Sequence, residues 1–394
     1  MVWKTNYQKV HYFNFESNER LKAIFDKDLS PERIVSELSI FSGSKIVENT
    51  DLVFFDEIQS CEKALTSLKY FSEQKPDIHL IAAGRLLGVA INRQNHSFPV
   101  GKIAFETMYP MDFEEFLWAI LQHEAANLIR SCFEKNSECS LHATFMDFYK
   151  QYLIVGGMPQ IVMEFIETKS FENIYPLQRN IFDSYIADMA KYANGQETVR
   201  IISCYNSIPA QLAKENKKFQ YKIIKSGARS NVYETAVDWL KSSGILHCFN
   251  KVKSGHFPLQ AFTEHSSFKL YMADTGLLCA KYNIPANMLL SDSDMVNNIK
   301  GVLTENFVAC TLISNGYNAN YWESDGKAEV DFVIQNQAGD IIPVEVKSSE
   351  NVRSKSLLQY ITLYKPQYSI RISTKNFGYE NHIKSVPVYA TFCI

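Results

Sequence analysis

Short apolar runs alternate with amphipathic segments over the first 85 residues. The runs at 9–16, 51–56 and 79–84 predict strands, and several of them are apolar on both faces. Apolar residues recur every three or four positions over 30–43 and 63–74, which predicts helices. Strands and helices that alternate in this way predict a parallel sheet with helices packed on its faces.

Beyond Pro110 the pattern becomes helical until about residue 200 and then changes again. Residues 205–275 predict two short helices followed by two strands, which is a winged-helix pattern. Residues 296–394 predict a helix, three strands, a second helix and a last strand. We therefore expect an α/β multidomain chain with four parts: a partial parallel sheet over 1–108, a helical region over 109–200, a winged helix over 201–290 and an α/β domain over 291–394.

Composition and charge narrow the class of protein. Hydrophobic residues make up 46% of the chain and charged residues 21%, which indicates a globular protein. The formal net charge of −3 is no general sign of a polyanion partner, so any nucleic-acid surface has to be local. Eight cysteines without a C-x-x-C pair indicate reduced thiols. No signal peptide or membrane-spanning run is visible, and we expect a cytoplasmic protein without a membrane partner.

The segment DLVFFDE at 51–57 ends an apolar strand with two carboxylates. In P-loop enzymes a strand-end Asp holds Mg²⁺ and a neighbouring Glu can orient water, so Asp56 and Glu57 are candidate catalytic residues, with Asp56 also binding cofactor. A solvated acidic pair at a strand edge is the alternative. The loop G-x-x-x-x-G-K-[ST] that should precede such a strand does not occur in the sequence. We therefore expect ATP to bind weakly or not at all.

Two carboxylates and a lysine are close together in the C-terminal segment. Glu345 and Lys347 are two apart on a predicted strand and so share a face, and Asp331 lies across the hairpin turn NQAGD. Glu305 lies on the helix that opens the segment. Carboxylates at Glu305, Asp331 and Glu345 suit Mg²⁺, and Lys347 suits a catalytic role toward water or phosphate. A solvated Glu–Lys pair is the alternative. If these carboxylates meet, repulsion should make at least one hold its proton more tightly.

A basic run precedes the second helix of the winged-helix pattern. Arg229 and Asn231 lie at the start of this helix, after Lys225, Lys218 and Lys217. Recognition helices read bases from their first residues, and lysines that neutralise phosphates release counterions, so Lys225, Arg229 and Asn231 are candidate DNA contacts. A winged helix that binds protein, or a merely solvated basic face, is the alternative.

Motifs along most of the chain carry a resemblance to a known family. In order, they are LVFFDEIQ, HLIAAGRLLG, SFPVGK, MYPMDFEEFL, YLIVGGMPQIV, SIPAQLAKEN, MADTGLL and EVDFV…PVEVKSS. Together they resemble a prokaryotic family of AAA-like P-loop ATPases with a C-terminal domain similar to restriction endonucleases. The resemblance implies a partial AAA-like sheet, a helical lid, a winged helix and a restriction-endonuclease-like domain.

Two departures from the family pattern qualify what the resemblance implies. Family members begin with a strand and a phosphate loop, which we expect either to precede Met1 or to be lost in a degenerate paralogue. Their AAGSLLG motif carries a small polar residue that can sense the γ-phosphate, and Arg85 stands there in this sequence. The implied function is action on or with DNA, with ATP turnover lost or weakened and Mg²⁺ at the nuclease-like site. The alternative is a non-catalytic protein that binds a partner, a second copy or a full-length paralogue.

Overall fold

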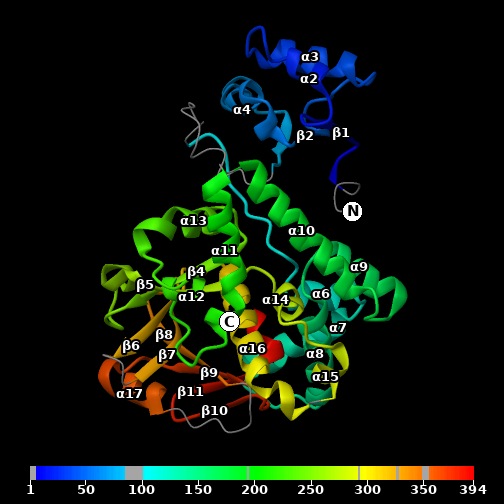
Figure 1. The fold of residues 1–394 in the computed structure, drawn as a ribbon. Helices are drawn as coiled ribbons and strands as arrows, with labels where there is room; N and C mark the ends of the chain where they lie inside the picture. Colours follow the sequence, from blue (N-terminus) through cyan, green and yellow to red (C-terminus); the bar gives the residue numbers. More distant parts are fainter. Residues whose placement is uncertain (1–5, 85–100, 193–194, 292, 325–327, 348–354) are drawn as a thin grey trace. The chain divides into compact units, whose positions relative to one another are not determined.

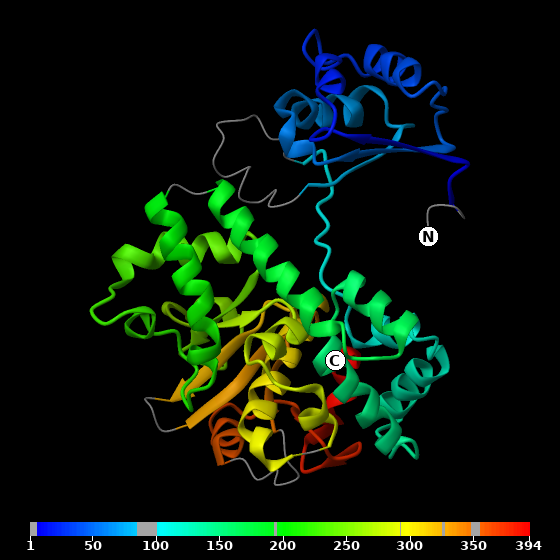
Figure 2. The same ribbon diagram turned by 45° about the vertical axis from the view of Figure 1, so that its right-hand side comes forward.

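A computed structural model describes residues 6–84, 101–192, 195–291, 293–324, 328–347 and 355–394. The chain divides into two compact units, Met1–Met108 and Tyr109–Ile394. Figures 1 and 2 show both units from two directions. Within the described ranges, no helix combines the length and the apolar character that a bilayer crossing requires.

The first unit contains the predicted parallel sheet, of order β1-β2-β3, but its helices pack on one face and not on both as expected. Phe13 and Phe55 point toward the helices and pack with Leu38 in one apolar core. Alternate strand residues point the same way, so the predicted apolar faces become this core. The elements are β1 (Lys9–Asn14), α2 (Glu19–Ala23), α3 (Pro31–Phe41), β2 (Asp51–Asp56), η1 (Ile58–Ser60), α4 (Glu62–Gln74) and β3 (His79–Ala82).

The opposite face of this sheet carries Tyr12, Phe54 and Ile81, which are aligned across the three strands. Tyr12 stacks on Phe54 with ring centroids 5.8 Å apart, and both Tyr12 and Ile81 are exposed. Asn14 and Asp56 are register partners at the ends of β1 and β2. The carboxyl end of this face therefore presents polar side chains.

The second unit is built on an eight-stranded mixed sheet of order β10-β11-β9-β8-β7-β6-β4-β5. Strands β4 and β5 are the two strands of the winged-helix pattern and pair antiparallel, and β4 also pairs in parallel with β6. One sheet therefore runs through the segments expected to form a winged helix and a separate α/β domain. The strands are β4 (Leu246–Val252), β5 (Thr263–Met272), β6 (Asn320–Ser324), β7 (Ala328–Gln335), β8 (Ile341–Val346), β9 (Ser369–Ser373), β10 (Gly378–Glu380) and β11 (Ile383–Pro387).

Helices fill the first half of this unit, as the periodicity predicts. The short helix expected at 207–216 is instead the end of α11, which continues through Pro209. The helices are α6 (Phe113–Ala119), α7 (His123–Lys135), α8 (His142–Val155), α9 (Pro159–Thr168), α10 (Ile174–Tyr192), α11 (Gly195–Leu212), α12 (Tyr221–Ile224), α13 (Ser230–Ser242), α14 (Thr275–Lys281), α15 (Ala286–Leu290), α16 (Asn297–Ser314) and α17 (Lys355–Tyr364), with the 3₁₀ turns η2 (Leu259–Phe262), η3 (Asp294–Val296) and η4 (Val388–Cys393).

Helices α16 and α17 cover opposite faces of the sheet (Figure 1). Tyr360 of α17 packs in a cluster with Val333 of β7. Phe332, the neighbouring residue of β7, contacts Tyr271, whose hydroxyl binds Glu305 of α16. Neighbouring strand residues point to opposite faces, so Glu305 approaches the sheet from the face that α17 does not cover.

A buried aspartate contacts both glycines of the segment VGGMP. Asp274 accepts hydrogen bonds from the backbone N–H of Leu277, which caps α14, and of Gly157, each at 2.7 Å. A Cβ at Gly156, where φ is +73°, would collide with the Asp274 carboxylate. Burial raises the pKa of Asp274 despite these bonds. The motifs VGGMP and MADTGLL are therefore two halves of one structural contact.

Candidate functional site

The acidic end of β2 is bound by neutral donors. Asp56 Oδ2 accepts hydrogen bonds from two side chains of β1. One donor is the Tyr12 hydroxyl, and the other is Asn14 Nδ2, which lies 3.0 Å away. Asp56 Oδ1 accepts from the backbone N–H of Glu57 at 3.0 Å. The hydrogen bond to Asp56 raises the pKa of the Tyr12 phenol. Three hydrogen bonds thus hold a half-buried carboxylate at the carboxyl end of the parallel sheet.

Glu57 follows Asp56 in a left-handed conformation. Its φ and ψ are +50° and +41°, a region that disfavours residues with a Cβ. Its carboxylate accepts a hydrogen bond from Gln59 Nε2 at 2.5 Å. Asp56 and Glu57 therefore lie together where the sequence predicts them, and their roles toward nucleotide stay predictions. Arg85, the other candidate cofactor-binding residue, lies outside the described residues.

In the second unit, β7 carries an irregularity at Asp331. Strand β6 advances two residues where β7 advances three, between Val330 and Val333. The additional residue is a β-bulge, which re-aims neighbouring side chains and recurs near active sites. The Asp331 carboxylate accepts a hydrogen bond from the backbone N–H of Val346 at 2.8 Å. The bulge therefore brings Asp331 to the end of β8.

The end of β8 carries the next two predicted residues. Lys347 Nζ lies 2.8 Å from Glu345 Oε1. The Glu345 side chain is 3% exposed, whereas that of Lys347 is 35% exposed. The Lys347 backbone N–H donates to the carbonyl of Ile372 in β9 at 2.8 Å and so extends the ladder beyond β8. Glu345 and Lys347 meet on one face, as their spacing predicts.

Glu305 reaches the cluster from α16 and is held by three side chains. The Tyr271 hydroxyl donates to its Oε1 at 2.5 Å, Lys269 Nζ lies 3.5 Å from the same oxygen, and Lys217 binds Oε2. The Glu305 side chain is only 5% exposed. Sequence spacing gives no signal for these partners, because Lys217 precedes Glu305 by 88 positions.

Burial and neighbouring charges shift the pKa values of Asp331 and Glu305 in opposite directions. Burial and the nearby charges of Glu345 and Glu305 raise the pKa of Asp331 well above its usual range. Burial also opposes ionisation of Glu305, but Lys217 and Lys269 outweigh it and lower the pKa of Glu305 to about 2. The expected repulsion is confirmed at Asp331, while Glu305 is an anion paired with lysines.

Donor chemistry separates Glu305 from the other two carboxylates. No group of three or more His, Cys, Asp or Glu side chains is arranged to hold a metal ion in the part of the chain that the structure describes. Mg²⁺ often binds proteins through one or two carboxylates and keeps several waters. Asp331 and Glu345 are two such carboxylates, and Glu345 pairs with one lysine, Lys347, through Oε1. Glu305 differs, since two lysines and a tyrosine occupy its oxygens.

The predicted DNA contacts are exposed around the start of α13. Lys225 directly follows α12, Arg229 immediately precedes α13, and Asn231 lies in the first turn of α13. Glu234 and Asp238 are also exposed further along this helix. Lys241 adds one basic residue in the last turn, where it pairs with Asp238.

The two lysines upstream of this helix differ from the prediction. Lys217 and Lys218 were expected to add phosphate contacts, but Lys217 pairs with Glu305 and Lys218 with Glu323. Both glutamates are buried. A buried carboxylate needs a cation more than an exposed one does, so these lysines compensate the charges of two buried glutamates.

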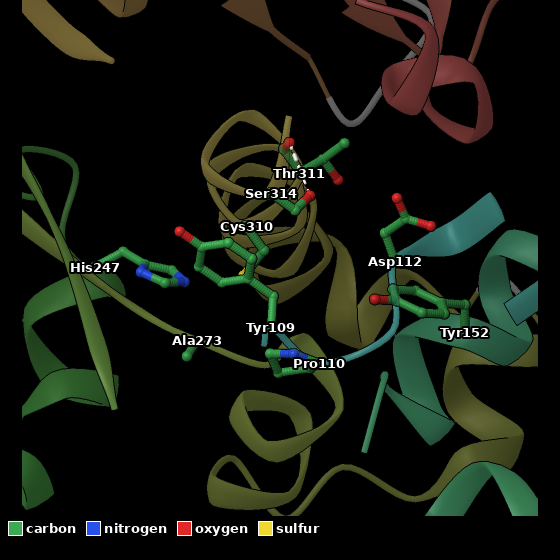
Figure 3. Close-up of a pocket in the computed structure, with 9 residues that line it drawn as sticks. All are labelled: Tyr109, Pro110, Asp112, Tyr152, His247, Ala273, Cys310, Thr311 and Ser314. Atoms are coloured by element: carbon green, nitrogen blue, oxygen red, sulfur yellow. Dashed lines mark hydrogen bonds between the residues drawn. The ribbon is translucent and has the colours of Figure 1, made fainter. Parts of the chain in front are cut away.

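A small cavity lies beside the start of the helical region (Figure 3). Its volume is about 10 Å³, roughly the space of one water molecule. Burial lowers the pKa of His247 to about 4 and raises that of Asp112 to about 6. The cavity is too small for a nucleotide. Its lining consists of Tyr109, Pro110, Asp112, Tyr152, His247, Ala273, Cys310, Thr311 and Ser314.

Comparisons with known proteins divide the chain into three segments. Residues 1–117 match the model of an AAA domain, 146–287 match a domain of unknown function (DUF8612), and 300–391 match another (DUF4143). A search of curated proteins finds no match. A solved structure of the Walker-type ATPase PABY2304 of Pyrococcus abyssi is similar at 13% identity, covering 70% of this chain and 84% of that chain, with a TM-score of 0.40. A TM-score this low carries no argument about fold or site.

Proposed function

We propose that this chain, whose residues 1–117 match the model of an AAA domain, acts on DNA through a divalent-cation site in its second unit. Asp331 and Glu345 would hold one Mg²⁺ or Mn²⁺. Lys347 would face the phosphodiester, and Lys225, Arg229 and Asn231 would contact the DNA. Nucleotide turnover at Asp56 and Glu57 would be weak or absent.

The observation that carries this proposal is that Asp331, at the bulge inside β7, lies beside Glu345 and Lys347 at the end of the adjacent strand β8. Burial and the charges of Glu345 and Glu305 raise the pKa of Asp331. A proton or a metal ion bound at this site would reduce the repulsion between the carboxylates and so stabilise the folded protein. The donors are hard oxygens, which suit Mg²⁺ and Mn²⁺.

The residues of this site have separate tasks in phosphodiester hydrolysis. A divalent cation would stabilise charge that develops on the phosphate. Lys347 is the partly exposed member of the cluster, and its ammonium group would orient the phosphate or the attacking water. Lys225 and Arg229 would neutralise backbone phosphates and release counterions.

Thermal unfolding with and without Mn²⁺ tests the cation site. Mn²⁺ at 100 times its Kd should stabilise the native chain by about 2.7 kcal/mol and raise the Tm of the second unit by several degrees. Asp331→Asn and Glu345→Gln should abolish the rise, because each removes one of the two proposed ligands. Asp238→Asn, at an exposed carboxylate of α13, should keep it. An equal rise in Asp331→Asn and the unaltered chain would place the ion elsewhere.

Fluorescence anisotropy with duplex DNA at several salt concentrations tests the nucleic-acid contacts. Lys225→Ala with Arg229→Ala should weaken binding and reduce the slope against log salt by about 2. Lys241→Ala is the matched control, since Lys241 is a partly exposed lysine at the other end of α13, paired with Asp238. Absence of binding even at low salt would remove DNA from the proposal.

One observation favours a second, non-catalytic function. Lys217, Lys269 and Tyr271 already satisfy Glu305, an arrangement that also suits a purely structural cluster. The exposed start of α13 would then dock protein, either a second copy of this chain or a full-length paralogue. Mn²⁺-dependent DNA cleavage that is lost in Asp331→Asn favours the first function. A stable protein complex that survives nuclease treatment, without cleavage, favours the second.

A further inference from the structure

Lys217 pairs with Oε2 of Glu305, the oxygen that Lys269 and Tyr271 leave open. Asp331 also feels the charge of Lys217. We infer that Lys217 and a divalent cation compete for the Glu305 carboxylate, so that Lys217 is a positioning residue that keeps Glu305 out of the metal site until a cation arrives. This inference rests on the proposed cation site at Asp331 and Glu345.

Lys269 cannot play this part, although it also lies beside Glu305. It belongs to strand β5, and its side chain is 1% exposed. Its Nζ binds Glu329 Oε1 at 2.5 Å and lies 5.0 Å from the centre of the Tyr321 ring. These contacts fix Lys269 in the sheet, so it remains with Glu305 when Lys217 leaves.

Lys217 is placed so that its side chain can leave without unravelling the fold. It lies in the irregular connection between α11 and α12, and its side chain is 16% exposed. The backbone just after it is anchored, since the Phe219 N–H donates to the Phe268 carbonyl at 2.8 Å. Gln220 exchanges two hydrogen bonds with Gln211, at 2.9 and 3.0 Å. Rotation of the Lys217 side chain would therefore free Glu305 Oε2 without a change in this backbone.

The Lys217 ammonium group and a divalent metal ion are alternative partners for Glu305. With Lys217 in place, Glu305 Oε2 is already paired with an ammonium group and is not available to a divalent cation at Asp331 and Glu345. Once Lys217 leaves, Oε2 becomes available as a further ligand. Lys217 should therefore weaken cation binding, and its effect should require a charged Glu305.

Mn²⁺ binding to the full chain, followed by the electron paramagnetic resonance signal of free Mn²⁺, tests the competition. Lys217→Met should tighten binding about tenfold, because it removes the competing charge. Lys217→Arg retains the charge and should bind Mn²⁺ within about threefold of the unaltered chain. In a Glu305→Gln background, Lys217→Met should change the affinity by less than about threefold, since the contested carboxylate is gone. Melting curves verify that each variant is folded.

The outcomes separate this inference from the proposed function. Equal affinity of Lys217→Met and the unaltered chain, with binding lost in Asp331→Asn, overturns the competition and leaves the cation site standing. Failure of both proteins to bind Mn²⁺ overturns both. A tenfold gain that persists in the Glu305→Gln background overturns the competition, because it indicates general repulsion. If Lys217→Met does not fold, Lys217→Gln is uncharged, can still donate to Glu305, and should show the same tightening.

Discussion

Two acidic clusters in this chain are stabilised in different ways. At the end of β2, Asp56 is half-buried and accepts hydrogen bonds from a hydroxyl, an amide and a backbone N–H. In the second unit, Glu305 is buried and is held by Lys217 and Lys269. A carboxylate near water keeps its charge with hydrogen bonds alone, whereas a buried one needs a cation or a proton. The same pattern of acidic residues beside apolar runs therefore describes two physical situations.

The largest difference should appear when a cation is removed from the buried cluster. Lys269→Met removes one of the two lysines that pair with buried Glu305, and the same lysine pairs with Glu329, so it should lower the free energy of unfolding of the second unit by about 3–5 kcal/mol. Lys241→Met breaks a partly exposed pair with Asp238 and should cost less than about 1 kcal/mol. Urea denaturation followed by circular dichroism measures both. Similar losses in the two variants would show that Lys269 is not needed to compensate the buried charges.

Acid should weaken the second unit through Glu305. The pKa of Glu305 is lowered from 4.5 to about 2 in the folded protein, so its stabilisation is present above pH 4.5 and is lost as the pH falls toward 2. A shift of this size corresponds to a loss on the order of 3 kcal/mol. Glu305→Gln should flatten this part of the profile of unfolding midpoint against pH. An unchanged acid limb in Glu305→Gln would assign the transition to other groups.

Asp331 should show the opposite sign. Its folded pKa is raised, so its contribution is complete below about pH 3.8 and is lost as the pH rises through the folded pKa. Asp331→Asn removes this loss. The variant should therefore match or exceed the stability of the unaltered chain at neutral pH without metal, by about 1–2 kcal/mol at most. Marked destabilisation at neutral pH would show that the hydrogen bond to Val346 outweighs the repulsion.

Substitutions at the end of β2 should have small effects. Tyr12→Phe removes one hydrogen bond to Asp56 at an exposed position and should cost the first unit about 0.5–1.5 kcal/mol. Scanning calorimetry of the full chain measures this change. A loss as large as that of Lys269→Met would place Asp56 in the same class as the buried cluster.

The smallest effect should be that of Asp56→Asn on nucleotide binding. The sequence contains no G-x-x-x-x-G-K-[ST] loop, and Asp56 already has three hydrogen bonds. Titration calorimetry of this chain with Mg-ATP should therefore give no low-micromolar binding, and Asp56→Asn should leave the result unchanged. Low-micromolar affinity would show that other residues hold the phosphates.

Local patterns predicted much of the fold and the core of the candidate site. Strand periodicity and hairpin spacing predicted that Asp331, Glu345 and Lys347 meet, because two strands joined by a tight turn have a fixed register. The same reasoning could not find Lys269 or Tyr271. They come from β5, and their contact with Glu305 depends on how α16 packs against that strand.

Other features depend on packing between distant segments. A basic run does not reveal which lysine faces the interior, so Lys217 was expected at a DNA surface although it lies beside Glu305. The segment at 207–216 contains Pro209, which resembles a helix start. In the structure it continues α11, since residues from Gly195 onward already form the helix. Similarly, hairpin periodicity gives no sign that β4 has a second neighbour.

That second neighbour limits how the chain can be divided for expression. Strand β4 joins β6 through the pairs Lys251–Tyr321 and Val252–Trp322, and residue 290 lies between these strands in the sequence. A cut there would give each fragment an uncovered strand edge with unsatisfied N–H and C=O groups, and such edges template pairing between molecules. Fragments 201–290 and 291–394 should therefore precipitate when made separately. Residues 109–394 should be kept together as the smallest soluble product of the second unit.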